Sequence, residues 1–214
     1  MSTITLDQQS AITSILSRMV HLSVGVGDEE RACSIAAINL ALSGELTDSV
    51  PDCMSLVVGR WIIGVQDEIP DELRNSARWR SLLPRAAGTG RELEAERVEL
   101  LMGWMWDVVL PALQPTADAR GFGDHWLHMC TERTAKAAGR AKEAAVDGVA
   151  SAAAGSAWGA AGNTSPAAMI LRVAWVRTAA AAVADAVGWG ALDPCELLEA
   201  LIETKANEPA CAAG

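Results

Sequence analysis

The sequence predicts an all-α protein, a helical bundle of about seven to eight helices with an Ala-rich C-terminal hairpin. Half of the residues are apolar and alanine dominates among them, and alanine favours the helix more than any other residue. The strict alternation of apolar and polar residues that marks a half-buried strand is almost absent. Acids, prolines and glycines that start or end helices divide the chain into segments of helical length.

The first 113 residues contain the helices with conventional apolar stripes. Asp7 is placed to cap a helix over 8–23, and Asp28 is placed to open a second helix that ends near Ser43. Pro84 is expected to end a short helix. The further helices expected in this part cover 52–66, a turn after Pro70, 79–83 and 91–113.

The helix over 91–113 carries the strongest signal. Its first half is charged, whereas Val98 to Leu110 is apolar on nearly all sides, which is typical of a buried helix. This apolar run is too short to cross a bilayer and contains Asp107. Pro111 and Pro115 are expected to end the helix.

Alanine dominates the sequence beyond residue 121. It predicts one helix over 124–161, a break at 162–166 and a second helix over 167–187, which together form a tight antiparallel hairpin. Asp193 followed by a proline starts a last amphipathic helix over 194–205.

A length of 214 residues suits one domain or two small ones. We expect an N-terminal bundle over 6–113 and the Ala-rich hairpin with the last helix over 121–205, both within one continuous domain. Residues 206–214 are expected to fray.

The formal net charge of −10 argues against direct binding to nucleic acid, which requires clustered Lys and Arg. No membrane segment is expected either. The count of five cysteines is odd, no pair has the Cys-x-x-Cys spacing, and the first residues do not resemble a secretory signal. These features predict reduced thiols in a cytoplasmic protein.

A series of short motifs runs through most of the chain in a fixed order. The motifs are Cys33, Ser-Gly-Glu at 43–45, Pro-Asp-Cys at 51–53, Val-Val-Gly-Arg-Trp at 57–61, Leu-Leu-Pro-Arg at 82–85, Gly-Thr-Gly at 88–90, Trp-Met-Trp-Asp at 104–107 and the Ala/Trp-rich tail. In this order they resemble a group of uncharacterised helical proteins found in high-GC bacteria and their phages. The resemblance implies an all-α cytoplasmic protein from the phage or actinobacterial gene pool, and it implies no particular activity.

One candidate site is a zinc site. His125 and His128 are three residues apart, so on a helix they face the same way. Cys33 and Cys53 would complete four zinc ligands. The alternative is that the histidines lie on the surface and the cysteines are inert, buried thiols, with no cofactor.

A second candidate is an interaction surface on the Ala-rich helices. Gly155 and Gly159 have the spacing of small residues that lets two helices approach closely, with Trp158 between them. This pattern favours a close-packed hairpin or a homo-oligomer.

Two weaker patterns have structural alternatives. The Gly-Thr-Gly at 88–90 precedes a helix but lacks the Lys-Ser/Thr of a phosphate-binding loop, so a hinge is favoured. Asp52, Asp67, Glu68 and Glu72 offer carboxylates for acid/base work, yet no nucleophile is spaced to use them.

Two functions therefore stay open. The first is a non-enzymatic interaction protein that binds a host or self partner through an acidic helical surface. The second is a small helical metal-binding protein or enzyme that uses Cys33, Cys53, His125 and His128.

Overall fold

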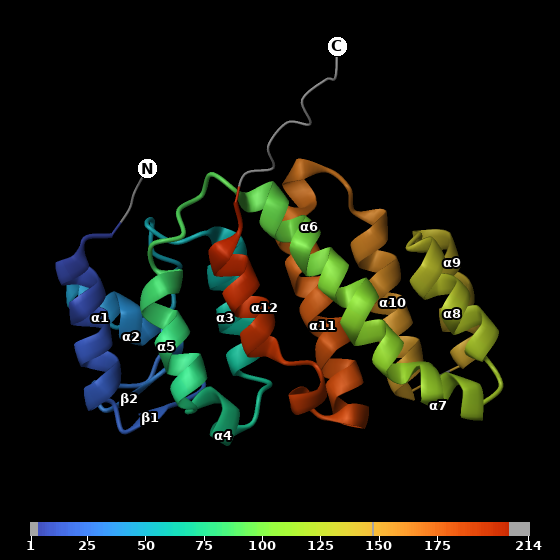
Figure 1. Cartoon of the computed structure of the whole chain (residues 1–214), viewed down its shortest axis with the longest axis horizontal. Helices are drawn as coiled ribbons and strands as arrows, with labels where there is room; N and C mark the ends of the chain where they lie inside the picture. Colours follow the sequence, from blue (N-terminus) through green and yellow to red (C-terminus); the bar gives the residue numbers. More distant parts are fainter. Residues whose placement is uncertain (1–3, 147, 206–214) are drawn as a thin grey trace, which may run out of the picture.

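The computed structural model describes residues 4–146 and 148–205, and it confirms the all-α fold. Figure 1 shows α1, α2 and α5 at one end of the long axis and α8 and α9 at the other. The helices of the described residues are labelled α1 to α12, more than the seven to eight expected, because long predicted helices are divided. The fraying expected for 206–214 falls outside the described residues.

The first part of the chain folds into short helices and one pair of two-residue strands. These elements are α1 (Leu6–Arg18), β1 (His21–Leu22), β2 (Arg31–Ala32), α2 (Ser34–Ser43), α3 (Leu56–Gln66), α4 (Asp71–Arg74) and α5 (Ala77–Ala86). The second part includes one π-helical turn, η1, and three short 3-10 turns, η2 to η4, in the described residues. Its elements are α6 (Glu94–Trp104), η1 (Met105–Val109), η2 (Leu110–Leu113), α7 (Gln114–Ala119), α8 (Gly123–Glu132), α9 (Ala135–Ala145), α10 (Gly148–Gly162), η3 (Pro166–Ala168), α11 (Met169–Val187), η4 (Trp189–Ala191) and α12 (Pro194–Glu203).

The first two helix starts differ from the sequence prediction. Thr5, rather than Asp7, caps α1, and the helix ends at Arg18 instead of reaching residue 23. Asp28 does not open α2. Its carboxylate accepts hydrogen bonds from the amides two and three residues later, each at 2.9 Å, and so closes a turn. This turn lies between the two strands of the parallel pair β1–β2, and Cys33 caps α2.

Three prolines expected to end helices lie inside them. Pro84 is within α5, and Pro111 and Pro115 stand near the starts of η2 and α7. A proline in the first turn of a helix loses no hydrogen bond, because an amide there has no intrahelical partner. The chain therefore continues past residue 113 through a change of helix type rather than a break.

The single helix predicted over 124–161 is three helices, α8, α9 and α10. The separations fall at Arg133 and Val146, which have φ values of 54° and 60°. Few non-glycine residues adopt this region, so neither residue itself signals a turn, although the Asp-Gly pair at 147–148 that follows Val146 is a typical turn sequence. The predicted pairing of 167–187 with the preceding Ala-rich helix is present as the contact of α10 with α11.

One core of buried side chains runs through most of these elements. Trp61, Trp79 and Trp126 are among its largest fully buried residues. α11 packs against α3 and α6 on one side and against α10 on the other. The buried Arg97 of α6 donates to the carbonyl of Leu201 at 3.1 Å and so holds α12 in place. These contacts join the Ala-rich helices to the N-terminal bundle.

Candidate functional site

The four candidate zinc ligands lie on separate elements. Cys33 caps α2, where its Sγ accepts a hydrogen bond from the Ala36 amide at 3.3 Å. Cys53 lies in the turn before α3, and His125 and His128 lie exposed on α8. α2 and α8 stand at opposite ends of the molecule (Figure 1), and the described residues contain no group of three or more His, Cys, Asp or Glu side chains able to hold a metal. The fold therefore does not bring the four residues together within one chain.

Three of the cysteine thiols among the described residues, Cys53, Cys130 and Cys195, are poor nucleophiles. Burial raises the pKa of Cys130 to about 11, and it also raises the pKa of Cys53 and Cys195. A thiol with a raised pKa is protonated at neutral pH, whereas the thiolate is the nucleophilic form.

The turn over 88–90 holds the chain together rather than forming an open anion site. The Thr89 hydroxyl accepts a hydrogen bond from the Ser55 amide at 3.0 Å. The carbonyls of Thr89 and Gly90 accept hydrogen bonds from Arg97, at 2.8 and 3.1 Å. These hydrogen bonds connect the turn to the start of α3 and to α6.

The carboxylates considered for acid/base work take part in the surface structure. Asp52 pairs with Arg91 at 3.3 Å, and Glu68 pairs with Arg177 at 2.9 Å. Burial raises the pKa of Asp67. No nucleophilic side chain among the described residues is hydrogen-bonded to these three acids.

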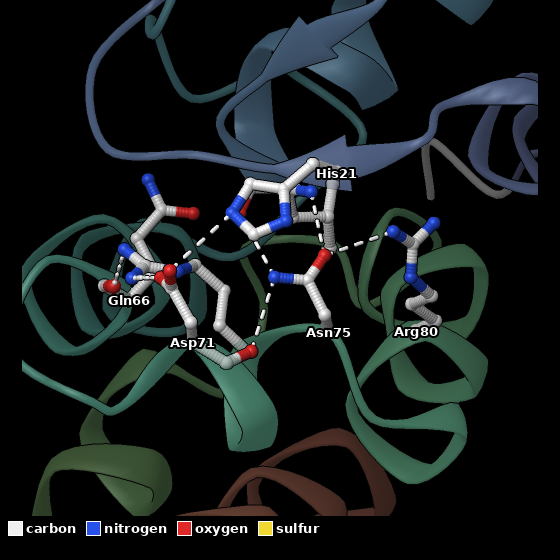
Figure 2. A network of polar contacts seen from close by, with 7 residues as sticks. His21, Gln66, Asp71, Asn75 and Arg80 are labelled. Carbon is white, nitrogen blue, oxygen red and sulfur yellow. Dashed lines mark hydrogen bonds and ion pairs between the residues drawn. The ribbon is translucent and has the colours of Figure 1, made fainter.

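Figure 2 shows a polar network that joins β1 to α4 and α5. The Asn75 side chain accepts from the Leu22 amide at 2.7 Å and donates to the Leu22 carbonyl at 3.2 Å, so it pairs with β1 as a neighbouring strand would. Arg80 donates to Asn75 at 2.9 Å. His21 lies 3.6 Å from Asp71, but no hydroxyl or thiol among the described residues bonds to the imidazole. We interpret this network as a structural joint that fixes the chain after α1.

The strongest candidate site is an exposed face of the Ala-rich helices, where α10 lies between α9 and α11 in a layer. We call it the α9–α11 face. Its central helix, α10, contains no charged residue. The face includes Lys142, Val146, Gly148, Ser151, Ala152, Gly155, Trp158, Leu171 and Trp175.

Large apolar side chains are exposed on this face. Trp158 is 54% exposed and Trp175 is 37% exposed, and Val146 and Leu171 are 80% and 55% exposed. The two tryptophans line one groove of about 490 Å3 together with Val146 and the small residues of α10. Exposed apolar patches of this kind mark interaction sites on soluble proteins.

The two predicted interface glycines have different roles. A Cβ at Gly159 would lie 2.6 Å from the Trp175 ring, so Gly159 provides space for a side chain of the same molecule. Gly155 lies in the groove, and a Cβ there would meet nothing closer than the Lys142 side chain at 3.6 Å. Gly155 and Trp158 thus belong to the exposed face, whereas Gly159 is buried. The sequence reasoning missed Trp175 and Leu171, because only the fold places α11 beside α10.

The border of the face is basic. Lys136, Arg140 and Lys142 are exposed on α9, and they form no ion pair with another described residue. The α9–α11 face therefore combines apolar side chains with the cation of Lys142, which has no ion-pair partner among the described residues, on a chain whose net charge is −10.

In a second groove, of about 520 Å3 between α1 and α5, the charged side chains are already bound within the chain. Its lining includes Arg80 and Arg85. Arg80 donates to the Leu16 carbonyl at 2.6 Å, and Arg85 pairs with Glu199 and Glu203. Both guanidinium groups are therefore already engaged within the chain.

Comparisons with family models, with curated proteins and with solved structures find no match for this chain. Among the described residues, no helix is both long and apolar enough to cross a membrane.

Proposed function

We propose that the protein is a non-enzymatic interaction protein and that its binding surface is the α9–α11 face. The observation that carries this proposal is Trp158, which is 54% exposed on a helix without charged residues. Tryptophan is among the residues that contribute most to binding energy at protein interfaces. A partner that covers Trp158 and Trp175 gains from the burial of their apolar surface without removing any α10 charge from water.

The arginines explain why we place the binding surface here rather than on an acidic surface. Many of the acids expected to bind a partner are paired with arginines of the same chain, and several of these pairs connect distant segments. A carboxylate that is already paired has less to gain from a second cation. The long-range pairs are Arg78–Asp193, Arg85–Glu199, Arg85–Glu203, Arg133–Asp107, Arg172–Glu99 and Arg177–Glu68.

A host protein and a second copy of the chain are the two kinds of partner that the proposal covers. Site-specific photo-cross-linking in cells that express the chain tests it. The cross-linking residue p-benzoylphenylalanine replaces Trp158 in one variant and Glu45 in a control, because Glu45 is exposed on the loop after α2, far from the face. We expect a discrete cross-linked species from position 158 and none from position 45. Equal or absent cross-linking at both positions would count against the proposal.

A further inference from the structure

We infer that the partner on the α9–α11 face is a second copy of this chain, which docks through a different surface, the groove between α6–η1 and α12. This inference rests on the proposed function and specifies its partner. The contact it describes is heterologous, with two different surfaces meeting, so each copy offers one free surface of each kind.

The docking groove of the second copy has a volume of about 430 Å3, and we call it the α6–α12 groove. It is apolar along its floor and acidic along its edges. The apolar residues include Leu100, Trp104, Val108 and Leu197, and the acidic residues are Asp107, Asp193 and Glu196. Val108 is 38% exposed, so the groove also presents an incompletely covered apolar side chain. Figure 1 shows α6 in front of α11 and α12 in front of α3.

The charges on the two surfaces are complementary. On α12, Glu199 and Glu203 are paired with Arg85 of the same chain, whereas α9 carries Lys136, Arg140 and Lys142 with one acid, Glu143. Asp107 and Asp193 are partly neutralised by Arg133 and Arg78, so Glu196 is the groove carboxylate with no ion-pair partner among the described residues. Opposite charges that flank apolar contacts orient a complex and speed its association.

The alternative of two α9–α11 faces meeting each other is less favourable. It would bring Lys142 of each copy to a groove whose described lining contains no acidic side chain, so neither cation would meet an opposite charge there. The acidic α6–α12 groove offers the same apolar chemistry with the opposite charge. Charge complementarity therefore selects the groove.

The first test is the mass of the purified full chain by sedimentation velocity across a range of concentrations. At low salt we expect a mass that rises with concentration above the 22.4 kDa of one chain. Added salt should return it toward the monomer, because 1 M salt shortens the screening length to about 3 Å. A chain that stays monomeric at every concentration and salt level would overturn the inference.

Complementation between two variants tests the heterologous geometry. Ala152→Glu places a charge on the α9–α11 face, and Glu196→Lys reverses a charge at the α6–α12 groove. Both positions are exposed, and circular dichroism of each variant checks that it folds. Each variant alone should associate at least tenfold more weakly than the unmodified chain. Mixed together they should form a 1:1 dimer, because each retains the surface that the other lacks. Ala119→Glu, at an exposed alanine of α7, should associate normally.

The outcomes separate this inference from the proposed function. If Ala152→Glu prevents association and the mixture does not recover it, two copies meet through the same face and the inference is wrong. If the chain is monomeric but position 158 still cross-links to another protein, the inference fails while the proposed function stands. If neither association nor cross-linking occurs, both fail.

Discussion

The N-terminal bundle and the Ala-rich helices bury their residues in different ways. The bundle fills its core with large side chains such as Trp61, Trp79 and Ile12, all of which are fully buried. In α9 and α10 the buried residues are only Ala, Ser and Gly. Small side chains remove little area from water, at about 25 cal/mol per Å2, so these helices depend on close backbone approach. The difference shows that one fold class can combine a core that covers its large apolar residues with a layer that leaves tryptophans exposed.

The largest expected effect comes from the large-residue core. Trp61 is fully buried and meets Trp104 edge to face, with ring centroids 5.3 Å apart. Trp61→Ala should lower the free energy of unfolding by about 3–5 kcal/mol, because it removes buried surface and leaves a cavity. Urea denaturation at concentrations where the chain is monomeric measures this. The matched control, Trp158→Ala, should change stability by no more than about 0.5 kcal/mol. Equal losses for the two would contradict the contrast between the regions.

Two glycine substitutions test the close-packed layer. Gly159→Ala should lower stability by about 1–3 kcal/mol, because the new Cβ meets the Trp175 ring at 2.6 Å and forces it to shift. Gly155→Ala meets no atom within 3.6 Å, so it should stabilise the monomer by up to about 1 kcal/mol through its helix propensity. Thermal unfolding of the two variants measures both changes in stability. If both substitutions stabilise the chain, α10 and α11 are not packed as closely as described.

A smaller effect is expected for the ion pair between Arg78 of α5 and Asp193, which caps α12. Burial acts to raise the pKa of Asp193, but hydrogen bonds from Arg78 and from the Glu196 amide outweigh it, and the net pKa is lowered. A lowered pKa in the folded state stabilises the fold above the ordinary pKa of 3.8, and this stabilisation is lost as the pH falls through the folded-state pKa. The pair is partly exposed, so its contribution should be at most about 1 kcal/mol.

Arg78→Ala tests this assignment. NMR titration of the Asp193 carboxyl should show a higher pKa in the variant, and the difference in stability between variant and unmodified chain should shrink below pH 3.8. Arg85→Ala is the control. It removes the ion pairs with Glu199 and Glu203 and should leave the Asp193 titration unchanged. An unchanged Asp193 pKa in Arg78→Ala would show that the ion pair does not form.

The smallest effect concerns zinc, whose predicted ligands are divided between the two regions. Only His125 and His128 share an element, and structural zinc sites use four ligands. Zinc titrated into the chain by calorimetry should therefore bind weakly, and His128→Ala should remove that weak binding. Cys33→Ser should leave it unchanged. Tight, stoichiometric zinc that depends on Cys33 would restore the four-ligand hypothesis.

Features that depend on neighbouring residues were predicted more accurately from the sequence than features that depend on contacts between distant segments. The last helix, expected over 194–205, is found as α12 (Pro194–Glu203), because Asp193 caps it and its apolar stripe lies within the segment. The turns at Arg133 and Val146 were missed, because alanine propensity predicts one continuous helix and neither residue is a typical turn former. Trp158 was selected from sequence, but its exposure depends on how α9 and α11 flank α10.

The sequence by itself determined the all-α class, the Ala-rich character of the second region and the approximate place of α12. Local propensities and apolar periodicity act over a few residues, so they are readable along the chain. Only the tertiary structure decided which residues meet. It set the Cys and His candidates apart, placed Trp175 over Gly159, and left Trp158 exposed in a groove that Lys142 also lines. These outcomes depend on contacts between distant segments, and a helix encodes which of its faces is apolar but not which neighbour covers it.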